Sequence, residues 1–177
     1  MPHSKWGMDA ASLDNHLRLL LGSYKRWTGR ELLPCTDEEG SEVSGRKPDE
    51  DRTPSSIGRS LSERLDAAPF ALLSHGTEAD PVLNYGNRMA LRLWEMDERQ
   101  FAGTPSRLTA EPLEREQRAR FMKRVTEQGY VEDYTGVRIS STGRRFEIID
   151  AVVWNVIDEE GRYRGQAATF TNYRYVD

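Results

Sequence analysis

Cysteine and histidine, on which most covalent and metal-centred protein chemistry depends, are scarce in this chain. One cysteine, Cys35, and three histidines occur among the 177 residues. A single cysteine excludes an internal disulfide framework and a cysteine-rich zinc site. So few histidines also argue against a conventional metal centre. We therefore expect no metal site and a chain that functions in a reducing compartment.

Long apolar runs and an excess of positive charge are missing as well. No apolar run approaches the roughly 18–20 residues that a membrane helix needs, and the N-terminus lacks the basic-then-apolar pattern of a signal peptide. The 25 basic and 29 acidic residues give a net charge of −4, which argues against non-specific binding to nucleic acid. We expect a cytoplasmic protein without a membrane or nucleic-acid partner.

Apolar residues are unevenly distributed along the chain and divide it into three parts. Between residues 9 and 27, leucines and aromatic residues recur at spacings of three and four, which predicts an amphipathic helix. Residues 36–56 are rich in acidic residues and hold one aliphatic residue, Val43, so we expect a flexible linker there. The resulting division is an N-terminal helical segment (1–35), the linker (36–56) and a folded domain (57–177).

The folded domain has the pattern of two strands, a helical stretch and three further strands. Strands are predicted at 70–76, 82–86, 130–140, 144–157 and 162–176, and the longest helix at 112–128. This order predicts an α+β fold, a five-stranded antiparallel sheet with a helical crossover of the PAS type. A cone-like α+β barrel of the kind found in small isomerases is the alternative.

The strand predicted at 144–157 is apolar on both faces, so both faces need a cover. Helices of the crossover can cover one face, and the N-terminal helix, its own or that of a second chain, can cover the other. A second chain in this role would make a homodimer, which we favour. Simple alternation puts Phe146, Ile148, Val152, Trp154 and Val156 on one face and Ile149, Ala151, Val153 and Ile157 on the other.

Several strings of this sequence resemble the MEKHLA domain, which occurs as a stand-alone bacterial protein and at the C-terminus of plant class III homeodomain–leucine zipper factors. They are APFALLSHGTEADPVLNYGN (68–87), PSRLTAEP (105–112), YTGVRISSTGRRF (134–146), VWN (153–155) and GQAA (165–168). The resemblance spans about residues 13–170 and implies a PAS-like sensory or regulatory domain. It implies no particular ligand, and no DNA-binding role carries over.

The resemblance raises the question of a bound cofactor, and the familiar signatures are missing. A cysteinyl flavin needs a cysteine on the helix after the second strand, whereas Cys35 lies near the acidic linker. A histidine-ligated haem needs a histidine on or near the long helix, and 112–128 contains none. We therefore expect neither cofactor, and the ligand of such a domain stays unidentified.

Polar residues inside apolar strands mark the candidate ligand site, because a buried polar group needs a partner. Such groups can also cap strand ends or bond to the backbone. With the aromatic residues expected around them, the candidate ligand-binding set is His75, Asn84, Trp94, Phe121, Tyr134, Trp154, Asn155 and Gln166.

An alternative function is a small barrel-like enzyme that uses His75 as a general acid or base. Glu78 and Asp80 lie in the turn after this histidine and could pair with it. No residue is assigned a catalytic role from the sequence, and an enzyme is the less favoured reading. The arginines of the helix at 112–128 each have an acidic residue nearby, so we interpret them as a solvated face.

Overall fold

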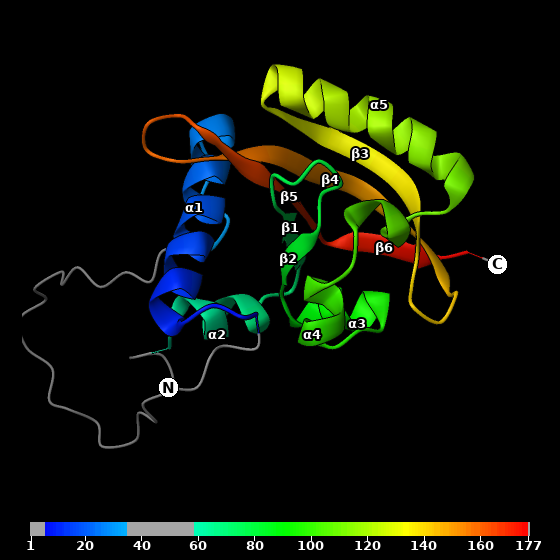
Figure 1. Ribbon diagram of the computed structural model, residues 1–177, viewed down its shortest axis with the longest axis horizontal. Helices are drawn as coiled ribbons and strands as arrows, with labels where there is room; N and C mark the ends of the chain where they lie inside the picture. Colours follow the sequence, from blue (N-terminus) through cyan, green and yellow to red (C-terminus); the bar gives the residue numbers. More distant parts are fainter. Residues whose placement is uncertain (1–5, 35–58, 177) are drawn as a thin grey trace, which may run out of the picture.

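The computed structural model describes residues 6–34 and 59–176, which form one mixed α and β unit (Figure 1). The acidic linker predicted at 36–56 and Cys35 lie outside the described residues. The elements are α1 (Ala10–Thr28), α2 (Leu61–Asp66), β1 (Ala71–His75), β2 (Leu83–Gly86), α3 (Arg88–Trp94), α4 (Glu98–Ala102), the 3-10 helix η1 (Ser106–Thr109), α5 (Pro112–Gln128), β3 (Tyr130–Ile139), β4 (Arg145–Ile157), β5 (Tyr163–Phe170) and β6 (Asn172–Tyr175).

The strands form one antiparallel sheet in the order β2-β1-β5-β4-β3, with β6 also paired to β4. Strands β5 and β6 together occupy the stretch that was predicted as one last strand, and they are separated by Thr171. The helices between β2 and β3 supply the crossover. The predicted α+β fold, a PAS-like antiparallel sheet with a helical crossover, is therefore confirmed.

Helices cover both faces of this sheet. On the inner face, α3, α4 and α5 enclose an apolar core in which the ring of Trp94 lies 5.0 Å from that of Phe146. On the outer face, α1 packs Leu17, Leu20 and Tyr24 against β1, β4 and β5. The expected position of the N-terminal helix is confirmed, and the sheet that it covers is that of its own chain.

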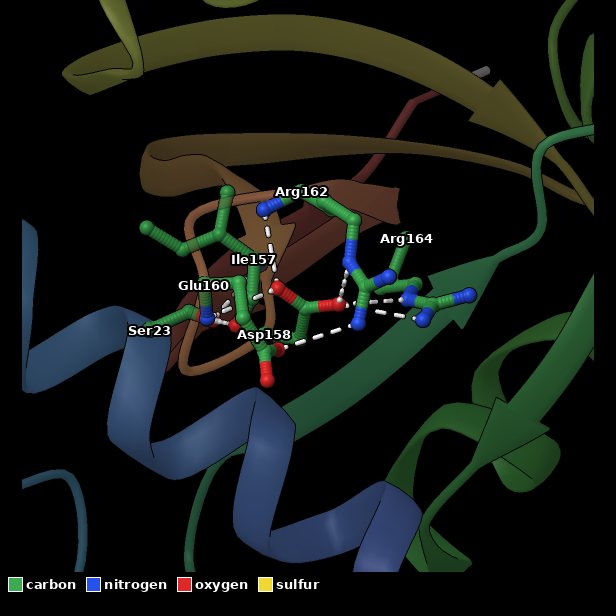
Figure 2. Close-up of polar contacts among 6 residues, drawn as sticks. All are labelled: Ser23, Ile157, Asp158, Glu160, Arg162 and Arg164. Atoms are coloured by element: carbon green, nitrogen blue, oxygen red, sulfur yellow. Dashed lines mark hydrogen bonds and ion pairs between the residues drawn. The ribbon is translucent and has the colours of Figure 1, made fainter.

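Hydrogen bonds fix the ends of α1 and its position on the sheet. Asp9 caps the first turn by accepting from the Ser12 amide at 2.7 Å. Near the other end, the Ser23 hydroxyl donates to the Ile157 carbonyl at 3.0 Å and accepts from the Ile157 amide at 2.9 Å (Figure 2). The next residue, Asp158, is the centre of a small polar cluster. The helix is thus tied to the turn between β4 and β5.

Asp158 holds that turn together through two arginines. Its carboxylate pairs with Arg162 at 2.9 Å and with Arg164 at 3.0 Å (Figure 2). Desolvation raises the pKa of Asp158, but the Arg162 amide and the two guanidinium groups outweigh it and lower the pKa to about 2. The carboxylate therefore stays ionised over the physiological range.

A β-bulge at Asp150 overturns the face assignment made for β4. Asp150 has a φ of 52°, and β3 pairs Tyr134 with Ala151 but Gly136 with Ile148, so two β4 residues oppose Thr135. The extra residue reverses the alternation within the strand. Phe146, Ile148, Ala151 and Val153 lie in the inner core, whereas Trp154 and Val156 lie in the outer one.

The bulge also removes the apolar strip on which the homodimer was argued. The homodimer assumed that the face with Ile149, Ala151, Val153 and Ile157 is the outer one, but Ala151 and Val153 pack with the inner helices. The outer apolar residues that do exist around Trp154 are covered by α1. A homodimer stays a prediction.

Candidate functional site

A cavity lies between the inner face of the sheet and the helical crossover. Its volume open to the centres of water molecules is about 40 Å³, which is room for a few waters. Much of its lining is apolar, including Leu83, Ile148, Val153 and Phe170. Polar lining residues come from the five elements β1, η1, α5, β3 and β5: Ser74, His75, Ser106, Thr109, Arg118, Tyr134, Arg138 and Gln166.

The eight predicted site residues separate into three groups. His75, Trp94, Tyr134 and Gln166 line the cavity. Phe121 and Asn155 lie one contact behind it: the Phe121 ring is 4.1 Å from that of Tyr134, and the Asn155 amide oxygen accepts from Gln166 at 3.1 Å.

Trp154 and Asn84 do not belong to the cavity. The Trp154 indole lies on the outer face because of the bulge, and it donates to the Leu20 carbonyl of α1 at 3.1 Å. The Asn84 amide oxygen accepts from the Ser74 hydroxyl at 2.5 Å, and Ser74 contacts His16 of α1 at 3.0 Å. Trp154 therefore binds α1 directly, whereas Asn84 is connected to α1 through Ser74, which itself lines the cavity.

Asn155 and Gln166 join the end of α5 to the sheet. Asn155 donates its side-chain amide to the Val125 carbonyl at 3.0 Å. Gln166 donates to the Thr126 hydroxyl at 3.2 Å as well as to Asn155. The helix end needs such partners because its last carbonyls have none within the helix. Of the two, Gln166 alone also reaches the cavity.

Two arginines of the cavity were missed by the sequence reasoning. Arg138 is 4% exposed. It donates to the Tyr134 hydroxyl at 2.5 Å and to the Val137 carbonyl at 3.0 Å. Arg118 of α5 donates to the Ser106 hydroxyl. The interpretation of the α5 arginines as a solvated face is therefore wrong for Arg118, which lies over the sheet instead.

Neighbouring groups change the pKa of Arg118. Burial lowers the pKa of Arg118 to about 10, the positive charge of Arg138 contributes to the decrease, and Tyr134 opposes it. Arg118 still carries its charge near neutral pH. One feature of the sequence, Gly136 between Tyr134 and Arg138, could have drawn attention to this part of the cavity, because a glycine in a strand often marks a close approach of another group. A Cβ atom at Gly136 would lie 2.7 Å from the Tyr134 hydroxyl oxygen.

The environment of His75 at the cavity favours its neutral form. Burial lowers the pKa of His75, hydrogen bonds to the Gly76 carbonyl and to Gln166 oppose this, and Arg118 lowers it further. Its Nδ1 atom lies 2.9 Å from the Gly76 carbonyl oxygen. The imidazole is therefore neutral at pH 7, with Nδ1 bonded to the backbone.

The acid–base pair of the alternative function is not assembled. Asp80 pairs with Arg107 at 3.1 Å, and Glu78 accepts from the Val82 amide at 3.3 Å. Within residues 6–34 and 59–176, neither carboxylate is hydrogen-bonded to His75, although Glu78 raises its pKa slightly through charge. The geometry gives no support to general acid–base chemistry at this histidine.

The cavity does not fit a haem or a cysteinyl flavin. Cysteine is missing from its lining, and His75 is the one histidine there. The open volume is also well below the roughly 300 Å³ at which ordinary ligand pockets begin.

In the described part of the chain, no three histidine, cysteine or acidic residues are grouped as a metal would require. No described helix is both long and apolar enough to span a membrane.

Comparisons with known proteins agree with this architecture. The PAS domain of a protein from Colwellia psychrerythraea superimposes with a TM-score of 0.53 at 16% identity, over 65% of this chain and 92% of that one. An RNA-binding light-oxygen-voltage receptor gives 0.53 at 17% identity, over 76% of this chain and 36% of that one. No curated protein matches the sequence. The MEKHLA domain pattern matches residues 14–175, and the chain therefore belongs to the MEKHLA domain family.

Proposed function

We propose that this chain is a PAS-like sensory domain that binds a small molecule in the cavity between α5 and the inner sheet face. The observation that carries the proposal is the convergence of polar side chains from β1, η1, α5, β3 and β5 on one partly apolar space. A concave site with a few placed polar groups on an apolar lining is the usual form of a small-molecule site. The PAS fold of the structural neighbours supports the same reading.

Hydrogen bonds around Asn155 connect the cavity to α1 on the outer face of the sheet. Gln166 lines the cavity and donates to the Asn155 side chain at 3.1 Å. The backbone carbonyl of Asn155 accepts from the Trp27 indole of α1 at 3.0 Å. A ligand that displaces Gln166 therefore acts on the strand segment to which α1 is bound. We propose that the position of α1 is the output of the domain.

Native mass spectrometry of freshly purified protein tests the proposal, because it reports a carried small molecule directly. Ala168 faces the cavity on β5, and Ala168→Leu fills part of the space. The matched control is Ala119→Leu on the exposed surface of α5. We expect a bound small molecule in the wild type and the control, and its loss in Ala168→Leu with an unchanged circular dichroism spectrum. A wild type that carries and accepts no small molecule would contradict the proposal.

A further inference from the structure

Two guanidinium groups, the buried one of Arg138 and the half-buried one of Arg118, face the cavity without an acidic partner. The cavity lining contains Arg118 and Arg138 but no aspartate or glutamate. Within the described part of the chain, the hydrogen bonds of both arginines go to neutral groups: the Ser106 and Tyr134 hydroxyls and the Val137 carbonyl. Burying a cation is costly unless an opposite charge compensates it. The cavity lining thus carries two positive charges and no negative one.

The two cations are close enough to repel each other. Both line the same cavity, as does Tyr134, whose hydroxyl accepts from Arg138 and whose ring centroid is 5.0 Å from the Arg138 guanidinium carbon. The charge of Arg138 also acts on Arg118. Like charges that act on each other in this way destabilise the folded state unless an anion binds near both. The repulsion favours an anionic occupant over a neutral one.

Trp94 brings a further donor to the cavity wall, one without an acceptor among the described residues. The indole Nε1 of Trp94 is buried, and no described residue accepts a hydrogen bond from it. Trp94 is 1% exposed and lines the same cavity as the arginines. An ionised carboxylate offers acceptors only, which matches a set of groups that are all donors. Guanidinium groups bind it in a bidentate geometry.

The rest of the lining sets the size and polarity of the occupant. Leu83, Ile148, Val153 and Phe170 present apolar surface, and the open volume is about 40 Å³. Such a wall suits a compact apolar group and leaves no room for a large ring system. We propose, on the basis of the small-molecule site above, that the cavity recognises a small monocarboxylate with a compact apolar body, whose carboxylate binds Arg118 and Arg138.

Titration calorimetry on the full chain tests this, with isobutyrate and its neutral isostere isobutyramide as probes. We expect isobutyrate to bind and to raise the melting temperature, and isobutyramide to bind at least about tenfold more weakly, since charge-assisted hydrogen bonds are lost. Arg118→Gln and Arg138→Gln should each weaken isobutyrate binding at least about tenfold. Arg120→Gln is the matched control, because Arg120 lies on α5 with its side chain 79% exposed.

The outcomes separate this inference from the proposed function. Equal binding of isobutyrate and isobutyramide, or an equal loss in Arg120→Gln and Arg118→Gln, overturns the carboxylate assignment but leaves a small-molecule site. Binding of inorganic phosphate in preference to isobutyrate overturns it too. Failure of all three probes, with no carried molecule in the mass spectrum, overturns both. Arg138→Gln alters a buried residue and could unfold the chain, which circular dichroism would detect. In that case Arg118→Gln, together with the comparison of acid and amide binding to the wild type, still decides the question.

Discussion

The indole nitrogen of Trp154 donates to the backbone carbonyl of Leu20 at 3.1 Å, in the middle of α1. Trp154 is completely buried, and its ring lies 5.0 Å from that of Tyr24 in an edge-on arrangement. One side chain of β4 thus both fills the outer core and fixes the helix along its axis. Because Trp154 lies on the face of the sheet opposite the cavity, a substitution there tests the packing of α1 and not ligand binding.

We predict that Trp154→Ala lowers the free energy of unfolding by about 3–5 kcal/mol, as for other large buried aromatic residues. The loss combines the cavity that remains and the hydrogen bond to Leu20. Denaturant unfolding followed by circular dichroism measures it. Tyr173→Ala is the control, because that aromatic side chain is among the exposed ones and should cost little. A loss below about 1 kcal/mol would show that Trp154 is not central to the fold.

Removal of residues 1–30 should expose the outer face and abolish the soluble, folded state. The truncated chain loses the helix that covers Leu72, Trp154 and Val156. An uncovered apolar sheet face of this kind leads to aggregation or to association with another chain. Light scattering of the full and truncated proteins measures both effects. The homodimer predicted from the sequence would be contradicted by a full-length monomer, and the covering role of α1 by a truncated protein that stays soluble and monomeric.

The order of elements and the place of α1 could be predicted because both rest on local periodicity. The spacing of Leu13, Leu17 and Leu20 gives a helical stripe, and the apolar alternation in β4 calls for a cover on each face. The sidedness of β4 could not be predicted, because a single residue in the left-handed conformation, Asp150, reverses the alternation. Trp154 was therefore assigned to the wrong face.

The site was harder to predict than the fold, because burial of a charged residue depends on tertiary packing. Arg118 has the sequence surroundings of an exposed helical arginine, yet it lies over the cavity. His75 and Gln166 could be picked out because a polar residue within an apolar strand is conspicuous. They are in fact cross-strand neighbours in the β1–β5 ladder. That pairing joins residues far apart in sequence, and strand patterns alone do not give the register.

Stability should decrease in mildly acidic solution because His75 is buried and His16 is half-buried. Burial lowers the pKa of His16 and of His75 below the ordinary value of 6.5. The unfolded chain then binds protons before the folded chain does, so the free energy of unfolding falls as the pH drops below about 6.5. We expect a lower denaturation midpoint at about pH 5.5 than at about pH 7.5.

His16→Gln tests the contribution of one of these groups. Glutamine can still contact the Ser74 hydroxyl, which lies 3.0 Å from the His16 Nε2 atom, but it does not titrate. The difference between the two midpoints should therefore become smaller in the variant, with its neutral-pH stability largely kept. An unchanged difference would mean that His16 does not contribute to the acid sensitivity.

Gly136→Ala should disturb the position of Arg138 without replacing a charged residue. The added Cβ atom would lie 2.7 Å from the hydroxyl oxygen and 3.0 Å from the Cζ atom of Tyr134, so the tyrosine must move. Its hydroxyl is the acceptor that holds Arg138. We expect a loss of stability of about 1–3 kcal/mol, as for other overpacked sites, and weaker isobutyrate binding.

Gly22→Ala is the matched control, because nothing lies within 4 Å of a Cβ atom at Gly22 of α1. Alanine is the better helix former, so this variant should gain about 0.5–1 kcal/mol. Thermal unfolding and titration with isobutyrate, run on both variants, separate the two glycines. If Gly136→Ala bound isobutyrate as tightly as Gly22→Ala does, Tyr134 would not be the residue that positions Arg138 for the ligand. Arg138 would then be held at the cavity by its hydrogen bond to the Val137 carbonyl.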